Sequence, residues 1–572
     1  MLSNGVTNID SITNFREYVQ AAKDCGMPAF GISEHGSCFE WVHKKESIEA
    51  AGMKYIHAVE AYLTEDDNTK FIYKAVDLFR STLVNRKKDV EVHFTEWDFT
   101  EDGKCVVESL EDSKCVWIDP ETIEKYKPLR NRDNYHCILI AKNLDGVREI
   151  NKMVSRSFCR EDEHFYYMPR MTFDELFATS DNVIVTTACL GGVLHNGNPA
   201  IKERMLGFLT QNKHRCYLEI QHHNCKEQIE YNQFLYEVSQ STGIPLIVGT
   251  DTHALNKDHL LGRSIMQKAK TVSFENEDDW DLTFKTPEQL VEAYKIQDSL
   301  PMSVVLEAMQ NTIVMSDSIE PFEIDRSPKY PKLYDDSEGV FKQKINEGVI
   351  SRGVNKYPNY NEYVDRIHYE YDTYKHNGAI DFMLLEENYK SEMRRRGIRF
   401  GYSRGSVSGS IIAYLLGITE IDSIKYNLNF DRFMNKERIS LADVDTDWFS
   451  EDRDTVKDYL HQKDGLYCCD IVTFNTIALK GAVKDICRGL YYDNLAHLPD
   501  DVKDEVKKWD KMNADRTKDN GTGYVVNDLP YPPELAKKIK KYSIHNVPLD
   551  YLDFAEKIIS IAEEDESKAR EE

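Results

Sequence analysis

Short apolar segments alternate with helix-like segments through the first 255 residues, and this pattern constrains the fold more than any other feature. The predicted strands are AFGIS at 29–33 and, further along, KYIHAVEAYL, YHCILIA, NVIVTTACL, YLEIQ and IPLIVGT. Residues 12–25 (ITNFREYVQAAKDC) have the apolar spacing of an amphipathic helix. Such alternation is typical of an α/β domain with mainly parallel strand pairing. The acidic, polar interval from about 64 to 134 is predicted to form an excursion from that core.

Length and composition predict several folded domains. A chain of 572 residues is too long for one core, so two to four domains are expected. The hydrophobic content of 41% predicts globular material. The sequence has no apolar run long enough for a membrane span, and it begins MLSNGVTNID, which predicts no secretory signal. Twelve scattered cysteines without a Cys-x-x-Cys pair predict free thiols in a reducing cytoplasm.

The formal net charge of −26 argues against a protein that coats nucleic acid through bulk positive charge. A local basic channel is still compatible with it. The segment KSEMRRRGIRFGYSRGS, residues 390–406, concentrates six Lys and Arg side chains against one Glu just before a glycine–serine turn.

The pattern changes after residue 256, where helices are predicted to dominate as far as about residue 400. Thr286 as N-cap, Pro287 at the first helical position and Gln289 two residues later predict one helix start. A Gly/Ser turn at 401–410, an apolar helix (SIIAYLLGI) and an acidic strand are expected next. The last hundred residues are predicted to be helical and highly charged.

The acidic strand is ISLADVDTDW at 439–448, with Asp443, Asp445 and Asp447 on alternate residues. In a strand, residues i and i+2 share a face, which sets these carboxylates about 7 Å apart. That arrangement is repulsive unless divalent cations lie between the oxygens, and Mg²⁺ or Mn²⁺ prefers such ligands. The alternative is an exposed acidic strand end.

A second set of residues lies at the ends of the predicted N-terminal strands. In α/β folds ligands gather beyond the carboxyl ends of strands, so a converging set would suit a multinuclear zinc, manganese or iron hydrolase site. Asp-x-His at 251–253 places two of the side chains on one face. The alternative is that each residue is an ordinary core or surface group. The set is His35, Glu60, His136, Cys189, Asp251 and His253.

Two further stretches could contact phosphates. FGYSRGSVSGSIIAYLLG at 400–417 offers glycine turns and hydroxyls beside a helix start, which suits a triphosphate, although it is not a P-loop and could be a connector. In TFNTIALKGAVKDICRGL at 473–490, Lys480, Lys484 and Arg488 form one cationic stripe on a helix. A helix that contacts a nucleic-acid backbone has this layout, and so do many solvated helix faces.

The order of these motifs resembles the family C replicative DNA polymerases, the bacterial and phage DNA polymerase III alpha subunits. The succession runs from the Gly-Ser turn and apolar helix through DRFMNKERIS and the Asp-x-Asp strand to TFNTIALKGAVKDICR, almost continuously over about 380–490. GMPAFGISEHGS, VEAY, HCILIAKNLDGVREINKMVSRSF, ACLGG and TDTHALNKDH resemble that family's PHP (polymerase and histidinol phosphatase) domain. The resemblance covers most of the chain, except the 64–134 interval and the last 80 residues.

The resemblance implies an α/β multidomain fold. Residues 1–258 would form a PHP-type (β/α) barrel, and 259–474 the N-terminal part of a mixed α+β palm of the polymerase beta-like nucleotidyltransferase type. A helical thumb would occupy 475–572. The family's third catalytic Asp lies in a Phe-Asp-Phe-Leu-Gly-type motif that does not occur before Glu572, so we expect the N-terminal portion of a polymerase.

The resemblance also implies template-directed DNA synthesis from dNTPs by a two-metal mechanism. Asp443 and Asp445 would hold two Mg²⁺ ions, whereas Asp447 would be structural. Primer-template DNA, the remaining polymerase portion and a sliding clamp would be the partners. The expected contacts to triphosphate or DNA backbone are Arg404, Gly405, Ser406, Arg432, Arg438, Lys480, Lys484 and Arg488.

In the PHP region the resemblance adds Asp10 to the six candidate ligands and implies a Zn²⁺ or Mn²⁺ site. The family's opening His-x-His pair is missing here, which puts a complete trinuclear cluster and a 3′–5′ exonuclease in doubt. Two alternatives therefore stay open. One is a PHP-type metal-dependent phosphoesterase with a degenerate palm. The other is a non-catalytic DNA- or partner-binding fragment of a split polymerase.

Overall fold

The computed structural model divides into two compact units, Met1–Glu323 with Asn475–Glu572, and Ile324–Phe474. Each unit is considered by itself. The structure describes residues 10–65, 71–74, 91–94, 105–109, 115–118, 129–130, 133–160, 164–165, 168–270, 280–327, 330–437, 443–469, 479–512, 517–519, 525–527, 531–549 and 551–564.

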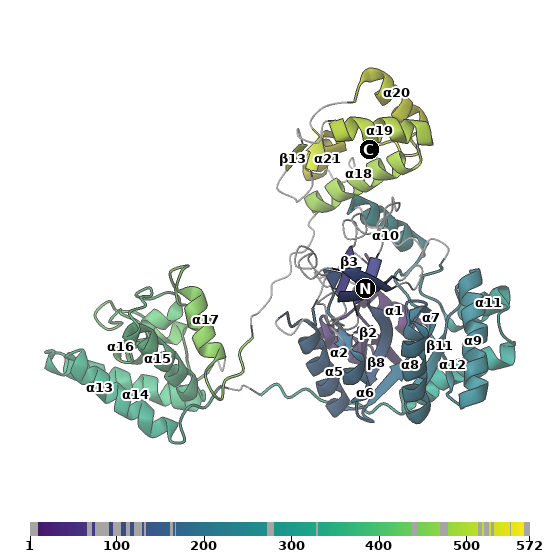
Figure 1. Ribbon diagram of the computed structural model, residues 1–572. Helices are drawn as coiled ribbons and strands as arrows, with labels where there is room; N and C mark the ends of the chain where they lie inside the picture. Colours follow the sequence, from purple (N-terminus) through teal and green to yellow (C-terminus); the bar gives the residue numbers. More distant parts are fainter. Residues whose placement is uncertain are drawn as a thin grey trace. The chain divides into compact units, whose positions relative to one another are not determined.

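A curled mixed sheet forms the centre of the first unit, in the order β1-β2-β8-β10-β11-β12 with β9 paired to β2 (Figure 1). Four of the six pairings are parallel, but β8 runs antiparallel to both of its neighbours. The mainly parallel sheet is therefore confirmed except at β8. The closed (β/α) barrel is not what the described strands form, because their order has two open edges, β1 and β12. The strands are β1 (Ala29–Ile32), β2 (Lys54–Thr64), β8 (Tyr135–Ala141), β9 (Met171–Thr172), β10 (Val183–Thr186), β11 (Cys216–Ile220) and β12 (Leu246–Val248).

Helices cover one face of this sheet and bury the main core. Val59, Leu139 and Leu218 of the strands pack there against Ile150 of α5 and Leu235 of α9. The opposite face carries a smaller cluster that includes Ala58, Ile140 and Ile247. The helices of this part are α1 (Phe15–Asp24), α2 (Trp41–Ala50), α5 (Leu144–Ser157), α6 (Phe173–Phe177), α7 (Val193–Asn196), α8 (Pro199–Gln211), α9 (Lys226–Thr242), α10 (Lys257–Ala269), α11 (Pro287–Gln297) and α12 (Met302–Asp317).

The predicted helix start at Thr286 is confirmed in detail. The Thr286 side chain accepts from the backbone N–H of Gln289, the Gln289 side chain accepts from Thr286, and Pro287 opens α11. The acidic interval contributes no described strand to the central sheet. Its strands pair with one another in the order β6-β5-β4-β3-β7. They are β3 (Phe71–Lys74), β4 (Glu91–Phe94), β5 (Cys105–Ser109), β6 (Cys115–Ile118) and β7 (Leu129–Arg130).

The C-terminal segment of the first unit is mainly helical, as predicted, with one short hairpin. Its helix α18 packs against α10. Lys268 of α10 and Lys270, which directly follows α10, form ion pairs with Asp493 (2.6 Å) and Asp485 (3.0 Å) of α18. The elements are α18 (Leu479–Ala496), α19 (Asp500–Met512), β13 (Thr517–Asp519), β14 (Val525–Asn527), α20 (Pro533–Tyr542) and α21 (Tyr551–Glu564).

The second unit is helical around a core that includes Phe341, Tyr374, Met383 and Phe430. An α+β palm sheet is not found in its described residues, where the one β-type contact is an isolated antiparallel bridge between Phe400 and Trp448. Its elements are α13 (Ser337–Ser351), η1 (Val354–Lys356), α14 (Tyr360–His376), α15 (Ile380–Arg395), η2 (Ser406–Gly409), α16 (Ile411–Leu415), η3 (Phe430–Arg432) and α17 (Arg453–His461). Across the described parts of both units, every helix is too short or too polar to cross a membrane.

Candidate functional site

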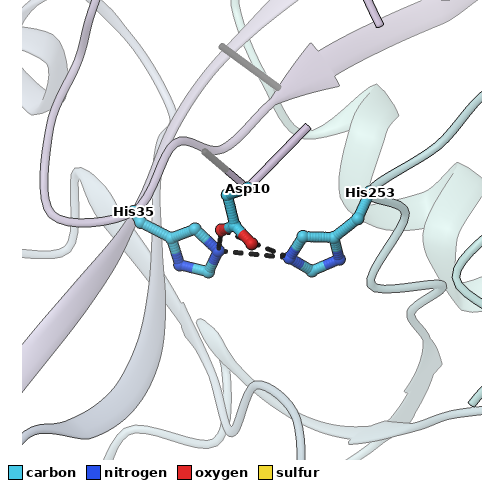
Figure 2. A group of neighbouring side chains, drawn as sticks. All are labelled: Asp10, His35 and His253. Carbon is cyan, nitrogen blue, oxygen red and sulfur yellow. Dashed lines mark hydrogen bonds and ion pairs between the residues drawn. The ribbon is translucent and has the colours of Figure 1, made fainter. Parts of the chain in front are cut away.

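One group of candidate metal ligands joins three segments that are far apart in the sequence (Figure 2). Asp10 precedes α1, His35 follows β1 and His253 follows β12. The Nε2 atoms of His35 and His253 are 3.2 Å apart, and Asp10 Oδ2 lies 3.6 Å from His253 Nε2. The same carboxylate oxygen pairs with His35 Nε2. These three predicted residues therefore converge on one point.

The backbone around Asp251 orients His253 for this group. His253 Nδ1 lies 2.8 Å from the carbonyl oxygen of Asp251, so Nδ1 carries the proton and donates it there. Nε2 is then the basic nitrogen and faces the other two side chains. Asp251 itself has φ +44°, a left-handed conformation that is uncommon for a non-glycine residue. Asp251 thus contributes its carbonyl to the site, and its carboxylate lies 3.7 Å from His253 Nδ1.

A second group consists of Glu60, His136 and Cys189. His136 Nδ1 lies 2.6 Å from Glu60 Oε1 and 3.3 Å from Cys189 Sγ. Glu60 lies within β2, and His136 is the second residue of β8. Because β8 is antiparallel, its first residues reach the sheet edge where the parallel strands end. The sequence prediction treated His136 as the end of a strand, whereas it lies near the start of β8. Because β8 runs in the reverse direction, its start lies at the same end of the sheet as the carboxyl ends of the parallel strands.

Charged residues of each group shift the pKa values of residues in the other group. Burial alone would raise the pKa of Asp10, but the charges of His253 and His35 hold that pKa well below its usual range. Burial would lower the pKa of His35, yet Glu60 and Asp10 raise it well above its usual value. Burial, with Asp251 and Glu60, raises the pKa of the Cys189 thiol well above normal. A bound cation would therefore have to displace protons from His35 and Cys189.

The donor sets fit a transition-metal cation. Zinc–nitrogen bonds of about 2.0–2.1 Å in a tetrahedron place two nitrogens about 3.3 Å apart, close to the separation of the His35 and His253 nitrogens. Nitrogen, sulfur and carboxylate oxygen are the ligands that zinc uses. Asp10, His35 and His253 would hold one ion, and Glu60, His136 and Cys189 another.

Two charged residues near these groups, the half-buried Glu219 and the buried Arg263, were not predicted. Glu219 on β11 accepts from Thr186 Oγ1 (2.6 Å) and Gln221 Nε2 (3.0 Å), and burial raises its pKa to about 7. Arg263 on α10 binds Asp10 (2.8 Å). Glu219 occurs in the predicted strand YLEIQ, where a carboxylate between apolar residues was a visible signal. Arg263 gave no signal, because its partner is 253 residues away.

The acidic stretch of the second unit alternates in its exposure to solvent but forms no strand over residues 443–447. Asp443, Asp445 and Asp447 are exposed, whereas the alternate residues Val444 and Thr446 are half-buried. The three carboxylates therefore share the solvent side, as predicted. The predicted strand over these residues is wrong, because residues 443–447 have no strand assignment. Gly401 N donates to Asp447 O at 2.9 Å, which fixes the end of the stretch beside the Gly/Ser turn.

The predicted phosphate-binding turn lies against these carboxylates. Arg404 Nη1 is 2.8 Å from Asp447 Oδ1, and a Cβ at Gly405 would come within 2.9 Å of Asp445 Oδ2. Gly405 has φ +74°, a backbone conformation that favours glycine at this position. Ser406 begins the adjoining turn η2 and is exposed. Arg404, Gly405 and Ser406 are thus brought together with the acidic stretch.

The start of α16 cannot serve as an anion site in this structure, contrary to the sequence interpretation. The buried carboxylate of Glu370 already accepts from the N–H groups of Ile411 and Ile412, both at 3.0 Å, and from Ser410 Oγ at 2.7 Å. Arg366 Nε donates to the same carboxylate at 2.8 Å. Ser410 is fully buried and belongs to this structural network.

The other predicted phosphate contacts differ in their surroundings. Arg432 is exposed at the end of η3, whose first turn packs against η2. Arg438 lies outside the described residues. On α18 of the first unit, Lys480 is exposed and Lys484 pairs with Glu556 (2.5 Å). Arg488 is buried and pairs with Asp485 (2.9 Å), so in this structure it stabilises the helix packing and does not face solvent.

Comparison with known proteins adds to this geometry. Residues 6–223 match the family described as PHP domain, and residues 339–543 match the Bacterial DNA polymerase III alpha NTPase domain. The chain is 28% identical to the DNA polymerase III subunit alpha of Borreliella burgdorferi over 84% of its length. It is also 28% identical to that of Aquifex aeolicus over 86%, and 25% identical to that of Helicobacter pylori over 94%. Over most of its length the chain is therefore similar to DNA polymerase III alpha subunits.

The similarity covers only part of each relative. The matched region covers 38% of the Borreliella protein, 40% of the Aquifex protein and 43% of the Helicobacter protein. The chain therefore spans about two fifths of the alpha subunits that it matches. The PHP match includes the whole Glu60–His136–Cys189 group, and the alpha-type match includes Arg404 and the acidic stretch.

Proposed function

We propose that this chain carries a nucleotidyl-transfer site for template-directed DNA synthesis in DNA replication. The supporting observation is the alternation of exposed carboxylates at 443, 445 and 447 beside the turn that holds Arg404 and Gly405. Carboxylates and an arginine at this spacing suit a metal-bound triphosphate. The PHP and alpha-type matches support the same function.

Each residue would have a distinct role. Asp443 and Asp445 would hold Mg²⁺ ions, which would activate the primer 3′-hydroxyl and neutralise charge on the α-phosphate. Arg404 would bind the triphosphate in exchange for Asp447, its present partner. Gly405 keeps the turn close to Asp445, so nucleotide and metal ligands would lie side by side. Arg432 and Arg438 would add positive charge, and Lys480 and Lys484 would contact the DNA backbone.

The substrates would be dNTPs and primer-template DNA. Because the chain covers about two fifths of its relatives, we propose that it works with the remaining polymerase portion, and that a sliding clamp belongs to the same assembly.

Primer extension tests this function. The purified chain is supplied with primer-template, Mg²⁺ and dNTPs, alone and with a polypeptide that carries the rest of an alpha subunit. We expect extension that the Asp443→Asn/Asp445→Asn variant loses by at least 100-fold. Asp454→Asn, which removes an exposed carboxylate of the same unit, should extend normally. Extension that is unchanged in the double variant would contradict the site, and no extension in either mixture would contradict the function.

A second candidate function is metal-dependent phosphoester hydrolysis at the PHP groups. It is favoured by the convergence of Asp10, His35 and His253 beside Glu60, His136 and Cys189. Zn²⁺ or Mn²⁺ held there would activate water and bind a phosphate oxygen. Hydrolysis of a DNA 3′ end by the chain, lost in His253→Ala and kept in Asp443→Asn, would favour this candidate. If His253→Ala hydrolyses as fast as the unchanged chain, the candidate is wrong.

A further inference from the structure

Arg263 is a buried cation that binds one of the candidate metal ligands twice. Its side chain is 4% exposed and projects from α10. Nη2 donates to Asp10 Oδ1 at 2.8 Å, and Nε donates to the backbone carbonyl oxygen of Asp10 at 2.7 Å. The planar guanidinium therefore fixes the main chain and the side chain of the same residue.

This contact divides the two oxygens of Asp10 between different tasks. Oδ1 faces Arg263, whereas Oδ2 pairs with His35 Nε2 and lies 3.6 Å from His253 Nε2 (Figure 2). A carboxylate bound only through Oδ2 could rotate about its side-chain torsions. With Oδ1 held by the guanidinium, Oδ2 is presented to the imidazoles in one orientation.

Further contacts hold the same segment against α10 and the residues before it. Thr13 Oγ1 lies 2.8 Å from His259 Nδ1 and accepts from the backbone N–H of Leu255 at 3.1 Å. The side chain of Ile12 packs over Gly262, where an added Cβ would come within 2.4 Å of it. Residues 10–13 thus pack against α10 and the residues just before it, and this packing places Asp10 in the metal group. Arg263 contributes a charged contact to the packing.

We propose that Arg263 is a positioning residue of the Asp10–His35–His253 metal group. This inference rests on the proposed binding of a cation by that group. Residues that hydrogen-bond a metal-ligating carboxylate typically change metal affinity 10- to 100-fold when they are removed, because the ligand loses its fixed orientation. Without Arg263, Asp10 Oδ1 would be a buried oxygen that has lost its strongest donor, and the carboxylate would turn toward other partners.

Zn²⁺ titration of the full-length chain by isothermal calorimetry tests the role of Arg263. We expect two binding events in the unchanged chain and loss of one of them in His253→Ala, which identifies the group. Arg263→Met should weaken that same event 10- to 100-fold and leave the other unchanged. Arg263→Lys should fall between, because one ammonium cannot reproduce both bonds of the guanidinium. Lys268→Met is the matched control on the same helix, since it removes an ion pair to Asp493 and should leave both events unchanged.

The outcomes distinguish the role of Arg263 from the binding of a metal by the Asp10–His35–His253 group. If the unchanged chain and His253→Ala bind Zn²⁺ identically, the metal group itself is wrong. If His253→Ala loses an event that Arg263→Met retains at full affinity, only the role of Arg263 is overturned. Arg263→Met could weaken both binding events and also change the circular-dichroism spectrum, which would mean that the variant is not properly folded. In that case the Arg263→Lys variant tests the role of Arg263. Full affinity at the first group in a folded Arg263→Lys chain would overturn the role of the two-bond contact.

Discussion

At the residue scale, the pKa of each carboxyl group near the metal groups depends on the charge of its neighbours. Asp10 and Glu60 are surrounded by histidines, whose charges hold their pKa values well below the usual range despite burial. Among the residues that the structure describes, the Glu219 carboxyl group receives hydrogen bonds only from the neutral Thr186 and Gln221, and it lies near Asp251 and Glu60. Its burial therefore dominates and raises its pKa to about 7.

The raised pKa of Glu219 predicts a pH-dependent stability. The unfolded chain releases the proton near the usual value of about 4.5, whereas the folded chain keeps it up to about pH 7. The proton-linked stability is thus fully present below pH 4.5 and is lost as the pH rises to 7. A shift of this size corresponds to about 3 kcal/mol.

The variant Glu219→Gln, which stays neutral, measures this effect. At each pH we take the melting temperature of the variant minus that of the unchanged chain. We expect this difference to be several degrees larger at pH 8 than at pH 5. The measurement is paired thermal melts at both pH values, with Glu237→Gln on the exposed side of α9 as control. A melting difference that does not change with pH would contradict the assignment.

Single residues were predictable where the chemistry is carried by the local sequence. His35, His253 and the alternating aspartates could be identified because each follows or forms a recognisable segment. Arg263 and Glu370 could not, since each acts on a partner that only the tertiary fold brings near. The sequence gives no local sign that Arg488 is buried, because its surroundings come from α21 and Asp485.

At the element scale, the Gly/Ser turn is held by a carboxylate from another helix. Glu370 of α14 caps the first N–H groups of α16 and also binds Arg366, which donates to the carbonyl oxygens of Gly409 (2.9 Å) and Leu428 (3.2 Å). These bonds connect α14, α16 and the segment before η3, and so fix the turn that carries Arg404.

Removal of this cap should destabilise the second unit. Glu370→Ala leaves buried N–H groups and Arg366 without their acceptor, so we expect a loss of about 3 kcal/mol in the free energy of unfolding. Urea unfolding checks this value, with Asp365→Ala on the exposed side of the same helix as control. A loss no larger in Glu370→Ala than in Asp365→Ala would show that the cap contributes little.

The packing of α10 against α18 depends on a close backbone approach. A Cβ at Gly489 would come within 2.2 Å of the carbonyl oxygen of Ile265, so no larger residue fits without separation of the helices.

Strand order, the reversal of β8 and this helix pairing are all long-range features. Periodicity predicted the elements themselves but not these pairings, because period and length say nothing about partners.

Gly489→Ala should therefore weaken the α10–α18 contact. Overpacking of this kind typically costs about 1–3 kcal/mol, which exceeds the gain in helix propensity of about 1 kcal/mol. Limited proteolysis should cut the chain faster within α18 than in the unchanged protein. Gly207→Ala in α8 is the matched control, because its Cβ would meet open space. Equal proteolysis of both variants would contradict the close packing.

At the scale of the whole molecule, the chain combines two kinds of candidate site. The first unit has nitrogen-, sulfur- and carboxylate-rich groups at the edge of a mixed sheet, which suit transition metals. The second unit has exposed carboxylates beside an arginine–glycine turn, which suit Mg²⁺ and a triphosphate. The PHP region and the general domain order could be predicted from motifs, whereas the open sheet edges and the absence of a palm sheet from the described residues could not.

We propose above all that the acidic stretch and the Arg404 turn together bind a metal–triphosphate. The most direct test of this proposal is equilibrium binding of dATP to the full-length chain with and without Mg²⁺, which needs neither DNA nor catalysis. We predict binding that depends on Mg²⁺, that weakens at least 10-fold in Arg404→Ala, and that loses its Mg²⁺ dependence in Asp443→Asn/Asp445→Asn. The control Asp454→Asn should bind as the unchanged chain does. The same affinity in all four proteins, or binding that ignores Mg²⁺ throughout, would contradict the account.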